Sequence, residues 1–493
     1  MRRLTRIIRN FLLLAVVAIV IVAAVLAFNV ATHGSRQLQV AAVPRAAVDK
    51  EAAATRLAEA IRFRTISSFE NPDSDTEALR GLQAHILKSF PAFHAAARRE
   101  VIAGYSLLYS WEGSDPKAPP IALLAHQDVV PVAPGTEKDW LKPPYDGVIA
   151  DGYIWGRGSW DDKGNLYSIL EAAEAMAKAG FRPKRTIYFA FGHDEEVAGT
   201  RGAKAIAATL ASRGVKLDFA IDEGLLITEG IMKGLDKPAA LIGVAEKGYV
   251  TLVLTAHSTP GHSSMPPHDT AIGTMSAALT RLEQHRLPMK VDGAVGEMFD
   301  MLAPEMTGFN RVVLSNLWLF KPLLLREFEK SGPTEAMTRT TTALTIFNAG
   351  DKDNVLPGNA SASVNFRLMP GDSQASVIDH VRRTINDDRI SIEPFPGNAE
   401  PTPITSTASP SYQTLNRTIR EIFPDVVVAP GLMLAGTDSR HYAGIADNIF
   451  RFSPVRAESN DLKRFHGTNE RLSVEGYADM IRFYRRLLEN SAG

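Results

Sequence analysis

The stretch Ile187-Tyr-Phe-Ala-Phe-Gly-His-Asp-Glu-Glu-Val-Ala-Gly199 decides the fold of this chain. Its first residues are apolar, β-branched or aromatic, as in a buried strand, and the run ends abruptly at His193-Asp-Glu-Glu196. Open α/β sheets bind their ligands at the carboxyl ends of their strands. Three adjacent carboxylates are costly to bury unless positive charge neutralises them. The stretch therefore predicts a central strand that delivers acidic groups to a site containing cations.

Other predicted strands also end in acidic or histidine residues. Ile121–Ala125 runs into His126-Gln-Asp128, and Asp218–Ile221 runs into Asp222-Glu-Gly224. Strands alternate with helices over residues 100–245, which predicts a doubly wound α/β sheet. Because the carboxyl ends of parallel strands share one edge, we expect the following groups to lie together: His126, Asp128, Asp161, Asp162, Glu195, Glu196, Asp222 and His466.

The 493 residues exceed one ordinary hydrophobic core and predict two domains. We expect a mixed-sheet α/β domain built from residues 49–246 and 370–493, with a smaller α+β domain inserted over residues 247–369. The inserted part contains a helical pattern and strands with one solvated face, namely Asp269–Arg286, Tyr249–Ala256, Thr338–Phe347 and Ser361–Leu368.

Residues 291–335 do not fit this minimal layout, because they are apolar and rich in Met, Leu and Phe. The simplest interpretation is additional helical packing. Two functional interpretations stay open, which are a wall for an acyl chain and a surface that faces a membrane.

The N-terminus differs in kind from the rest of the chain. Four arginines within residues 2–9 precede Phe11–Val30, twenty residues without a charge, which form a helix of about 30 Å that is long enough to cross a bilayer. Residues 1–30 are therefore predicted to be a basic cytoplasmic stub and an anchor, and residues 31–48 a linker, with everything after Val30 on the non-cytoplasmic side. Cleavage after Ala27 or Ala31 would instead release the chain as a secreted protein.

Composition limits the chemistry that is available. An apolar content of 45% and a charged content of 22% are typical of a globular protein, and the net charge of −1 gives no electrostatic reason to expect nucleic acid as a partner. The chain has no cysteine, which excludes disulfides and thiolate ligands. Any metal must be held by histidines and carboxylates, a ligand set that suits zinc, with Co²⁺ or Mn²⁺ as substitutes.

Five motifs in order resemble the di-zinc aminoacylase/carboxypeptidase metallopeptidase family, and especially its carboxypeptidase S and N-fatty-acyl-amino-acid hydrolase branch. The resemblance extends from about residue 50 to 490. The motifs are His126-x-Asp128, Gly156-Arg-Gly-Ser-Trp-Asp-Asp-Lys-Gly164, Gly192-His-Asp-Glu-Glu-Val-Ala-Gly199, Ile221-Asp-Glu-Gly224 and Phe465-His-Gly-Thr-Asn-Glu470.

This resemblance implies two zinc ions held by five side chains. His126 and Asp222 would hold one ion, and Glu196 and His466 would hold the other, while Asp161 would bridge them. Asp162 and Glu223 are interpreted as hydrogen-bonded neighbours of these ligands.

The resemblance also implies the catalytic groups. Asp128 would accept a hydrogen bond from the second nitrogen of His126. Glu195 would be the general base that takes a proton from a metal-bound water and later protonates the leaving amine.

Residues outside the metal motifs resemble substrate-binding positions of the same family. His262, in Thr259-Pro-Gly-His-Ser-Ser264, resembles the lid histidine that stabilises the tetrahedral oxyanion, often across a dimer interface, so a homodimer through the lid is one expected assembly. Arg367 resembles the arginine that grips the substrate carboxylate. Asn354, Gly436 and Thr437 resemble substrate-contacting loops.

These observations predict a zinc amidohydrolase or carboxypeptidase. It would cleave the amide bond of N-acyl amino acids or short peptides that carry a free C-terminal carboxylate. One alternative is a Gly-X-type carboxypeptidase or dipeptidase without preference for fatty-acyl groups. A second alternative is a non-catalytic, membrane-tethered binding protein, although the intact Glu195 argues against it.

Overall fold

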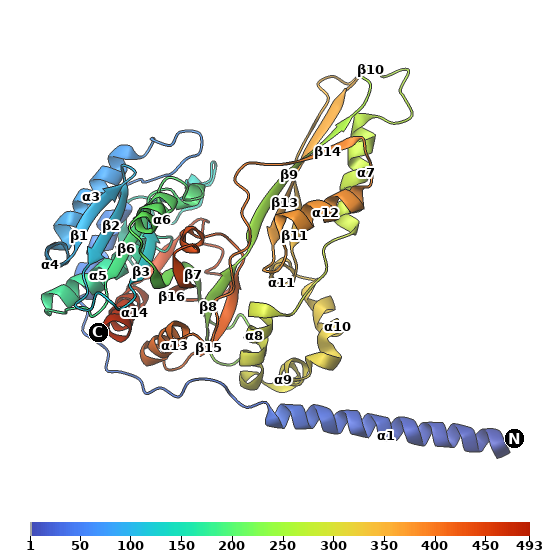
Figure 1. Cartoon of the computed structure of the whole chain (residues 1–493), viewed down its shortest axis with the longest axis horizontal. Helices are drawn as coiled ribbons and strands as arrows, with labels where there is room; N and C mark the ends of the chain where they lie inside the picture. The colour runs from blue at the N-terminus through green and yellow to red at the C-terminus, as the bar shows by residue number, and fades with distance from the viewer. Residues whose placement is uncertain (1) are drawn as a thin grey trace.

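The computed structural model describes residues 2–493 and divides them into three parts (Figure 1). A large α/β body contains both the first half and the C-terminal part of the chain. A smaller sheet domain projects from this body, and helix α1 (Arg2–Thr32) extends from it in a different direction.

The body is built on one mixed sheet of eight strands. Its strand order is β1-β2-β6-β3-β7-β16-β8-β15. Strand β3 pairs in parallel with both β6 and β7, whereas β2 pairs with its two neighbours in antiparallel fashion. The predicted α/β fold with a mixed sheet is confirmed. The strands are β1 (Arg98–Ile102), β2 (Ser106–Trp111), β3 (Ile121–His126), β6 (Ile187–Gly192), β7 (Leu217–Thr228), β8 (Ala239–Glu246), β15 (Val427–Met433) and β16 (Ala446–Ala457).

Helices cover both faces of this sheet, which explains why its central strands are apolar throughout. In β3, Leu123 packs into the core on one face, while Ala122 and Leu124 pack into the core on the other. Helix α6 (Ala203–Ser212) covers the second face. The first face is covered by α2 (Lys50–Ile61), α3 (Thr76–Ser89), α4 (Pro91–Ala96), α5 (Lys163–Lys178), α13 (Pro410–Ile422) and α14 (Val474–Ala492).

A separate three-stranded sheet joins a strand near the C-terminus to two strands from the first half of the chain. Its strands are β4 (Val148–Ala150), β5 (Tyr153–Trp155) and β17 (Arg471–Ser473), in the order β17-β5-β4. The pairing of β17 with β5 places the segment before Arg471 beside the loop that follows Trp155. Two motifs about 300 residues apart in sequence thereby become neighbours.

The projecting domain is an antiparallel sheet covered by two helices. Its strand order is β11-β13-β9-β14, and the apolar faces of α7 (Ala271–Gln284) and α12 (Gln374–Ile385) pack into a separate core with it. At the far end, the short strands β10 (Gly261–His262) and β12 (Val355–Leu356) form a small ladder. The sheet strands are β9 (Gly248–His257), β11 (Thr341–Ala349), β13 (Asn359–Leu368) and β14 (Ile390–Pro394).

The structure corrects the predicted boundaries of this lid, residues 247–369. Both α12 and β14 lie beyond residue 369 yet belong to the lid, because β9 is a central strand whose second edge is paired by β14. Conversely, residues 293–338 form helices that pack on the body, since apolar residues of α8 and α9 belong to its core. These helices are α8 (Gly293–Leu302), α9 (Gly308–Ser315), α10 (Leu317–Phe328) and α11 (Gly332–Thr338).

The predicted N-terminal apolar helix is present as α1. Residues 3–32 have a mean hydropathy of 3.3 over their most apolar part, which is not buried against the protein, so the helix is long and apolar enough to cross a membrane. The segment after it runs along the body in extended form. There the side-chain amide of Gln37 forms hydrogen bonds with the backbone N–H and carbonyl of Val428, at 2.7 and 2.9 Å, and so occupies the open edge of β15.

Candidate metal centre

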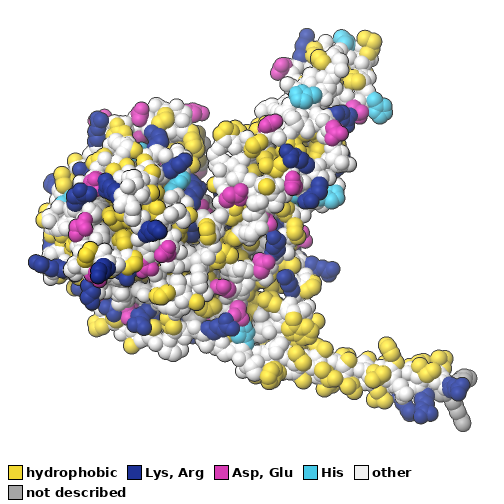
Figure 2. Space-filling view, in the orientation of Figure 1, with side chains coloured by type: hydrophobic (Ala, Val, Ile, Leu, Met, Phe, Trp, Pro, Cys, Tyr) yellow, Lys and Arg dark blue, Asp and Glu magenta, His cyan; other side chains and the backbone are white. Residues whose placement is uncertain are grey.

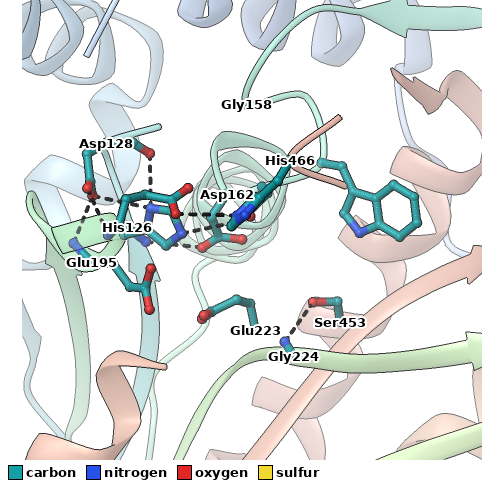
Figure 3. A network of polar contacts seen from close by, with 12 residues as sticks. His126, Asp128, Gly158, Asp162, Glu195, Glu223, Gly224, Ser453 and His466 are labelled. Atoms are coloured by element: carbon teal, nitrogen blue, oxygen red, sulfur yellow. Dashed lines mark hydrogen bonds and ion pairs between the residues drawn. The ribbon is translucent and has the colours of Figure 1, made fainter. Parts of the chain in front are cut away.

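Four of the predicted ligands meet at the carboxyl end of the central strands, namely His126, Asp161, Glu196 and His466. Figure 3 labels the two histidines of this group. His126 ends β3, Asp161 lies in the loop before α5, and Glu196 lies in the turn after β6. Ligand atoms of these three residues lie within 4.8 Å of one another. Asp161 Oδ1 is 3.0 Å from Nε2 of His126, and its Oδ2 is 2.8 Å from Nε2 of His466. Asp161 thus has the position of a carboxylate shared between two imidazoles.

The turn that carries the paired acids is fixed by Asp128. This buried carboxylate accepts backbone hydrogen bonds from Glu195 at 3.2 Å and from Glu196 at 3.1 Å. Its Oδ1 also lies 3.3 Å from Nδ1 of His126. The turn is a single 3₁₀ helix, Glu195–Val197, and it ends at Ala198, whose φ of 82° is rare for a residue with a side chain.

Glu470 and Arg157 hold the two distant motifs together, and the sequence did not single them out. Glu470 Oε1 accepts backbone hydrogen bonds from Gly158, Trp160 and Asp161 at 2.9–3.1 Å. Its other oxygen pairs with the buried guanidinium of Arg157, which also donates to the backbone carbonyl of His466 at 3.1 Å. The sequence shows only that a carboxylate lies four residues after His466. It does not reveal the structural role of Glu470, because hydrogen bonds to backbone N–H groups require no particular residue type in the partner segment.

The electrostatics of the cluster favour bound cations. Desolvation raises the pKa of Glu195, and the neighbouring carboxylates Asp438, Glu196 and Asp161 raise it further. Desolvation likewise raises the pKa of Glu196 and of Glu223. Without positive charge these groups tend to retain protons, whereas a divalent ion would stabilise their charged forms.

Asp161 differs from these acids, because the two imidazoles lower its pKa. Burial opposes its ionisation, but hydrogen bonds with His126 and His466 outweigh that effect and hold its pKa below the usual range. Burial also lowers the pKa of His466, yet the contacts with Asp161 and Glu196 dominate and raise it to about 10.

The donor set fits divalent metal ions. It consists of imidazole nitrogens and carboxylate oxygens with no thiolate, as sites for zinc and related ions do. Two buried carboxylate oxygens, Oε1 of Glu196 and Oε2 of Glu223, have no hydrogen-bond partner among the described residues. Coordination to an ion would give these buried acceptors the partner that they lack.

Asp222 is the predicted ligand that the structure does not bring into this cluster. Its Oδ2 accepts a hydrogen bond from the backbone N–H of Ser439 at 2.7 Å, and its Oδ1 accepts one from Glu223 at 3.1 Å. The side chain of Glu223 instead points toward the other acids, below Glu195 in Figure 3.

Two of the predicted substrate-binding residues, Arg367 and Thr437, lie where the lid joins the body. Arg367 is the penultimate residue of β13, and its guanidinium lies 4.7 Å from the ring centroid of Tyr249. Thr437 is fully buried, and its hydroxyl donates to Glu246 at 3.2 Å, so it is not exposed for direct substrate contact as the sequence had suggested. Arg440, which the sequence did not single out, donates to the carbonyl of Ala198 at 3.0 Å and lies 4.0 Å from Glu246.

The remaining candidates lie at the far end of the lid. His262 in β10 pairs with Val355 in β12, and the backbone N–H of Ser263 donates to the carbonyl of Asn354 at 3.1 Å. His262 and Asn354 are therefore close to each other, but the ten-residue strand β9 separates them from the body, a length of about 34 Å. Within one chain the structure does not bring them to the metal ligands.

A largely buried cluster of histidines and carboxylates at the strand ends of an α/β sheet is typical of metal-dependent hydrolases. Residues 122–490 match Peptidase family M20/M25/M40, and the chain belongs to this family. The predicted family membership and the predicted enzyme class are both confirmed.

Relatives of the chain carry two kinds of name. "Probable carboxypeptidase S-like 2" of Dictyostelium discoideum is 44% identical over 89% of this chain and 85% of its own length. "N-fatty-acyl-amino acid synthase/hydrolase PM20D1" of Xenopus tropicalis is also 44% identical, over 88% of this chain and 84% of its own. Carboxypeptidase S of Saccharomyces cerevisiae is 31% identical over 88% and 83% of the two chains.

Solved structures share the fold at low sequence identity. The metallo-carboxypeptidase Sso-CP2 from Sulfolobus solfataricus aligns with a TM-score of 0.65 and 16% identity, over 90% of this chain and 99% of its own. Human carnosine dipeptidase 1 aligns with a TM-score of 0.62 and 15% identity, over 90% and 96%. These likenesses support the fold alone.

Proposed function

We propose that this enzyme hydrolyses the amide bond of N-acyl amino acids, including N-fatty-acyl amino acids, that carry a free carboxylate. The observation that carries this proposal is the position of Asp161 between His126 and His466, with Glu195 on the adjoining turn. The relatives named for N-fatty-acyl amino acids, at 40–44% identity, support the substrate class. Hydrolysis of short peptides, as the carboxypeptidase S relatives suggest, is the second candidate.

The metal site is proposed to hold two Zn²⁺ ions, with Co²⁺ or Mn²⁺ as substitutes. His126 and Asp222 would hold one ion, Glu196 and His466 the other, and Asp161 would contact both. When bound, such ions polarise the amide carbonyl and make a bound water more acidic.

Glu195 is proposed to transfer a proton from the attacking water to the leaving nitrogen. With the cluster neutralised by cations, Glu195 would be ionised, and its burial, which raises its pKa, would make it a stronger base for a proton of that water. Asp128 keeps the turn and the imidazole of His126 in place, so the base and the ligand keep a fixed separation.

The substrate carboxylate is proposed to bind between Arg367 and Arg440. Among residues 2–493, no carboxylate forms an ion pair with Arg367, and Arg440 has only the distant Glu246, which is also paired with the buried Arg451 at 3.0 Å. A substrate carboxylate would supply the missing negative charge, and a guanidinium can bind it through two hydrogen bonds. The backbone of Gly436 lies beside Arg440 and would contribute to the same pocket.

His262 and Asn354 are proposed to act from a second copy of the chain. They lie too far from the metal ligands of their own body, as described above. The edge strand β11 of the lid exposes Ile346 and Phe347, at 55% and 44%, and an unpaired strand edge is suited to pairing with its symmetry mate. A dimer formed through this edge would let each lid serve the other body.

The location of the enzyme follows from α1. We propose that α1 is a single-pass anchor with its arginines in the cytoplasm and the catalytic body on the other side. If a signal peptidase cleaved this segment, the body would be secreted.

Kinetics on matched substrates test this function. Purified, metal-loaded full-length protein is assayed with an N-oleoyl amino acid, with the corresponding N-oleoyl amino acid amide, and with a blocked Gly-Leu dipeptide. We expect the highest kcat/KM on the N-oleoyl amino acid and a large loss on its amide, which lacks the carboxylate. Preference for the dipeptide would establish the second candidate, and absence of turnover on all acyl amino acids would support the binding-protein alternative.

A further inference from the structure

Helices α9 and α10 expose an apolar surface although they lie on the catalytic body. Helix α10 has no buried residue, and four large apolar side chains on the two helices are between 41% and 63% exposed. We name this surface the α9–α10 patch; it consists of Phe309, Trp318, Leu319, Pro322 and Leu323.

The patch has the pattern of a helix that lies in a membrane interface. Residues 318, 319, 322 and 323 fall on one side of α10, because positions three and four apart share a helix face. The exposed Lys321 borders this side, and the exposed Arg326 follows it in the last turn of the helix. Apolar side chains that include Trp, bordered by Lys and Arg, are typical of helices at the boundary between headgroups and acyl chains.

Helix α1 meets the body at this same place. Asn29 donates a side-chain hydrogen bond to Asn316 at 2.8 Å, and Asn316 directly precedes α10. The Arg311 guanidinium contacts the carbonyl of Val30 at 3.4 Å, and Val30 is the last residue of the uncharged run. In Figure 2 the apolar side chains of α1 continue onto the adjoining edge of the body.

We propose that the α9–α10 patch lies in the surface of a lipid bilayer and holds the catalytic body against it. The occupant is the headgroup and upper acyl region of an anionic leaflet, because the end of the apolar α1 run lies at the patch and because Lys321 and Arg326 are positively charged. The residues that follow α1 are also held on the body, since Arg36 pairs with Asp300 and Gln37 forms a hydrogen bond with Val428, so the body lies close to the end of α1. This inference does not depend on the substrate proposed above.

Trp318 provides a direct test with the full chain. The protein is reconstituted into vesicles of phosphatidylcholine and phosphatidylglycerol that contain phosphatidylcholine brominated either near the carbonyl end or near the methyl end of its acyl chains. The other four tryptophans lie in the body, and three of them are at most 6% exposed. We expect quenching by the lipid brominated near the carbonyl end, and we expect Trp318→Phe to abolish most of it.

Charge placed in the patch should remove the contact without unfolding the body. In the variant Leu319→Glu/Leu323→Glu, quenching of Trp318 should fall to the level of unbrominated vesicles, while metal content and thermal unfolding stay unchanged. Leu141→Glu, at a 73% exposed leucine of the body outside the patch, is the matched control and should retain quenching.

Two outcomes would overturn the inference. Equal quenching in the parent protein and in Trp318→Phe would place Trp318 outside the bilayer. Absence of quenching together with a dimer that Leu319→Glu/Leu323→Glu converts to a monomer would assign the patch to a second copy of the chain.

Discussion

Asp128 and Glu195 are joined by a hydrogen bond of 3.2 Å from the backbone N–H of Glu195 to Oδ1 of Asp128. The same buried carboxylate lies 3.3 Å from Nδ1 of His126. One side chain therefore orients a proposed metal ligand and positions the proposed base. This arrangement links the geometry of metal binding to the geometry of proton transfer.

Replacing Asp128 with asparagine should weaken both functions. The amide keeps one acceptor, but its NH₂ group faces either His126 or the backbone N–H groups of the turn. We expect kcat/KM or metal affinity to fall about 10–100-fold, as for other residues that orient metal ligands. Steady-state kinetics and metal titration measure these quantities. Asp388→Asn, at an exposed aspartate of the lid, is the control and should change neither.

The two adjacent acids should respond differently to substitution. Glu195→Gln is expected to retain the full metal content and to lose about 10²–10⁴-fold in kcat, because only proton transfer is removed. Glu196→Ala is expected to lose one equivalent of metal, because it removes an oxygen from the cluster. Elemental analysis and kinetics on both variants check this. Near-normal turnover by Glu195→Gln would show that another group is the base.

Metal binding should release protons and should strengthen as pH rises. In the protein without metal, the pKa of His466 is raised to about 10, so this imidazole holds a proton at neutral pH, and desolvation raises the pKa of Glu196, so its carboxylate also binds protons more strongly. Metal coordination requires their deprotonated forms. Raising pH removes the competing protons, so affinity increases with pH. Calorimetric titrations in buffers of different ionisation enthalpy measure the released protons, and a pH-independent affinity would contradict the proposed ligand set.

Asp222 and Glu223 require a direct comparison, because the family resemblance and the local geometry point to different side chains. If Asp222 is the ligand, Asp222→Asn should lose about one equivalent of metal, whereas Glu223→Gln should retain both. Metal analysis after dialysis against equal free zinc measures this. The reverse result would transfer the ligand role to Glu223, whose Oε2 is buried without a partner.

The sequence predicted the body of the fold well because its signals are local. The all-apolar runs of β3 and β6 predict strands that are buried on both faces. The acidic residues that follow these runs mark the carboxyl ends of the strands. Other features depend on contacts between distant segments. The short strand β14 joins the lid only because β9 has a free edge, and Glu470 acts through backbone N–H groups. Neither feature leaves a periodic pattern, so both were missed.

The position of His262 predicts catalysis shared between two chains. His262→Ala alone should lose about 10²–10³-fold in kcat, as when one oxyanion donor is removed. A mixture of His262→Ala and Glu195→Gln chains, unfolded and refolded together, should regain activity, because the mixed dimer contains one site with both groups intact. With random pairing in a two-fold dimer, the regained activity should be about a quarter of the parent value.

Two controls decide whether that activity comes from shared sites. Each variant refolded alone should keep only its low residual activity, and His268→Ala, at a fully exposed lid histidine, should behave like the parent protein. If the mixture remains inactive although size-exclusion chromatography shows mixed dimers, His262 does not serve the partner's site. Because β9 holds His262 about 34 Å from its own body, that result would require the lid to bend within a single chain.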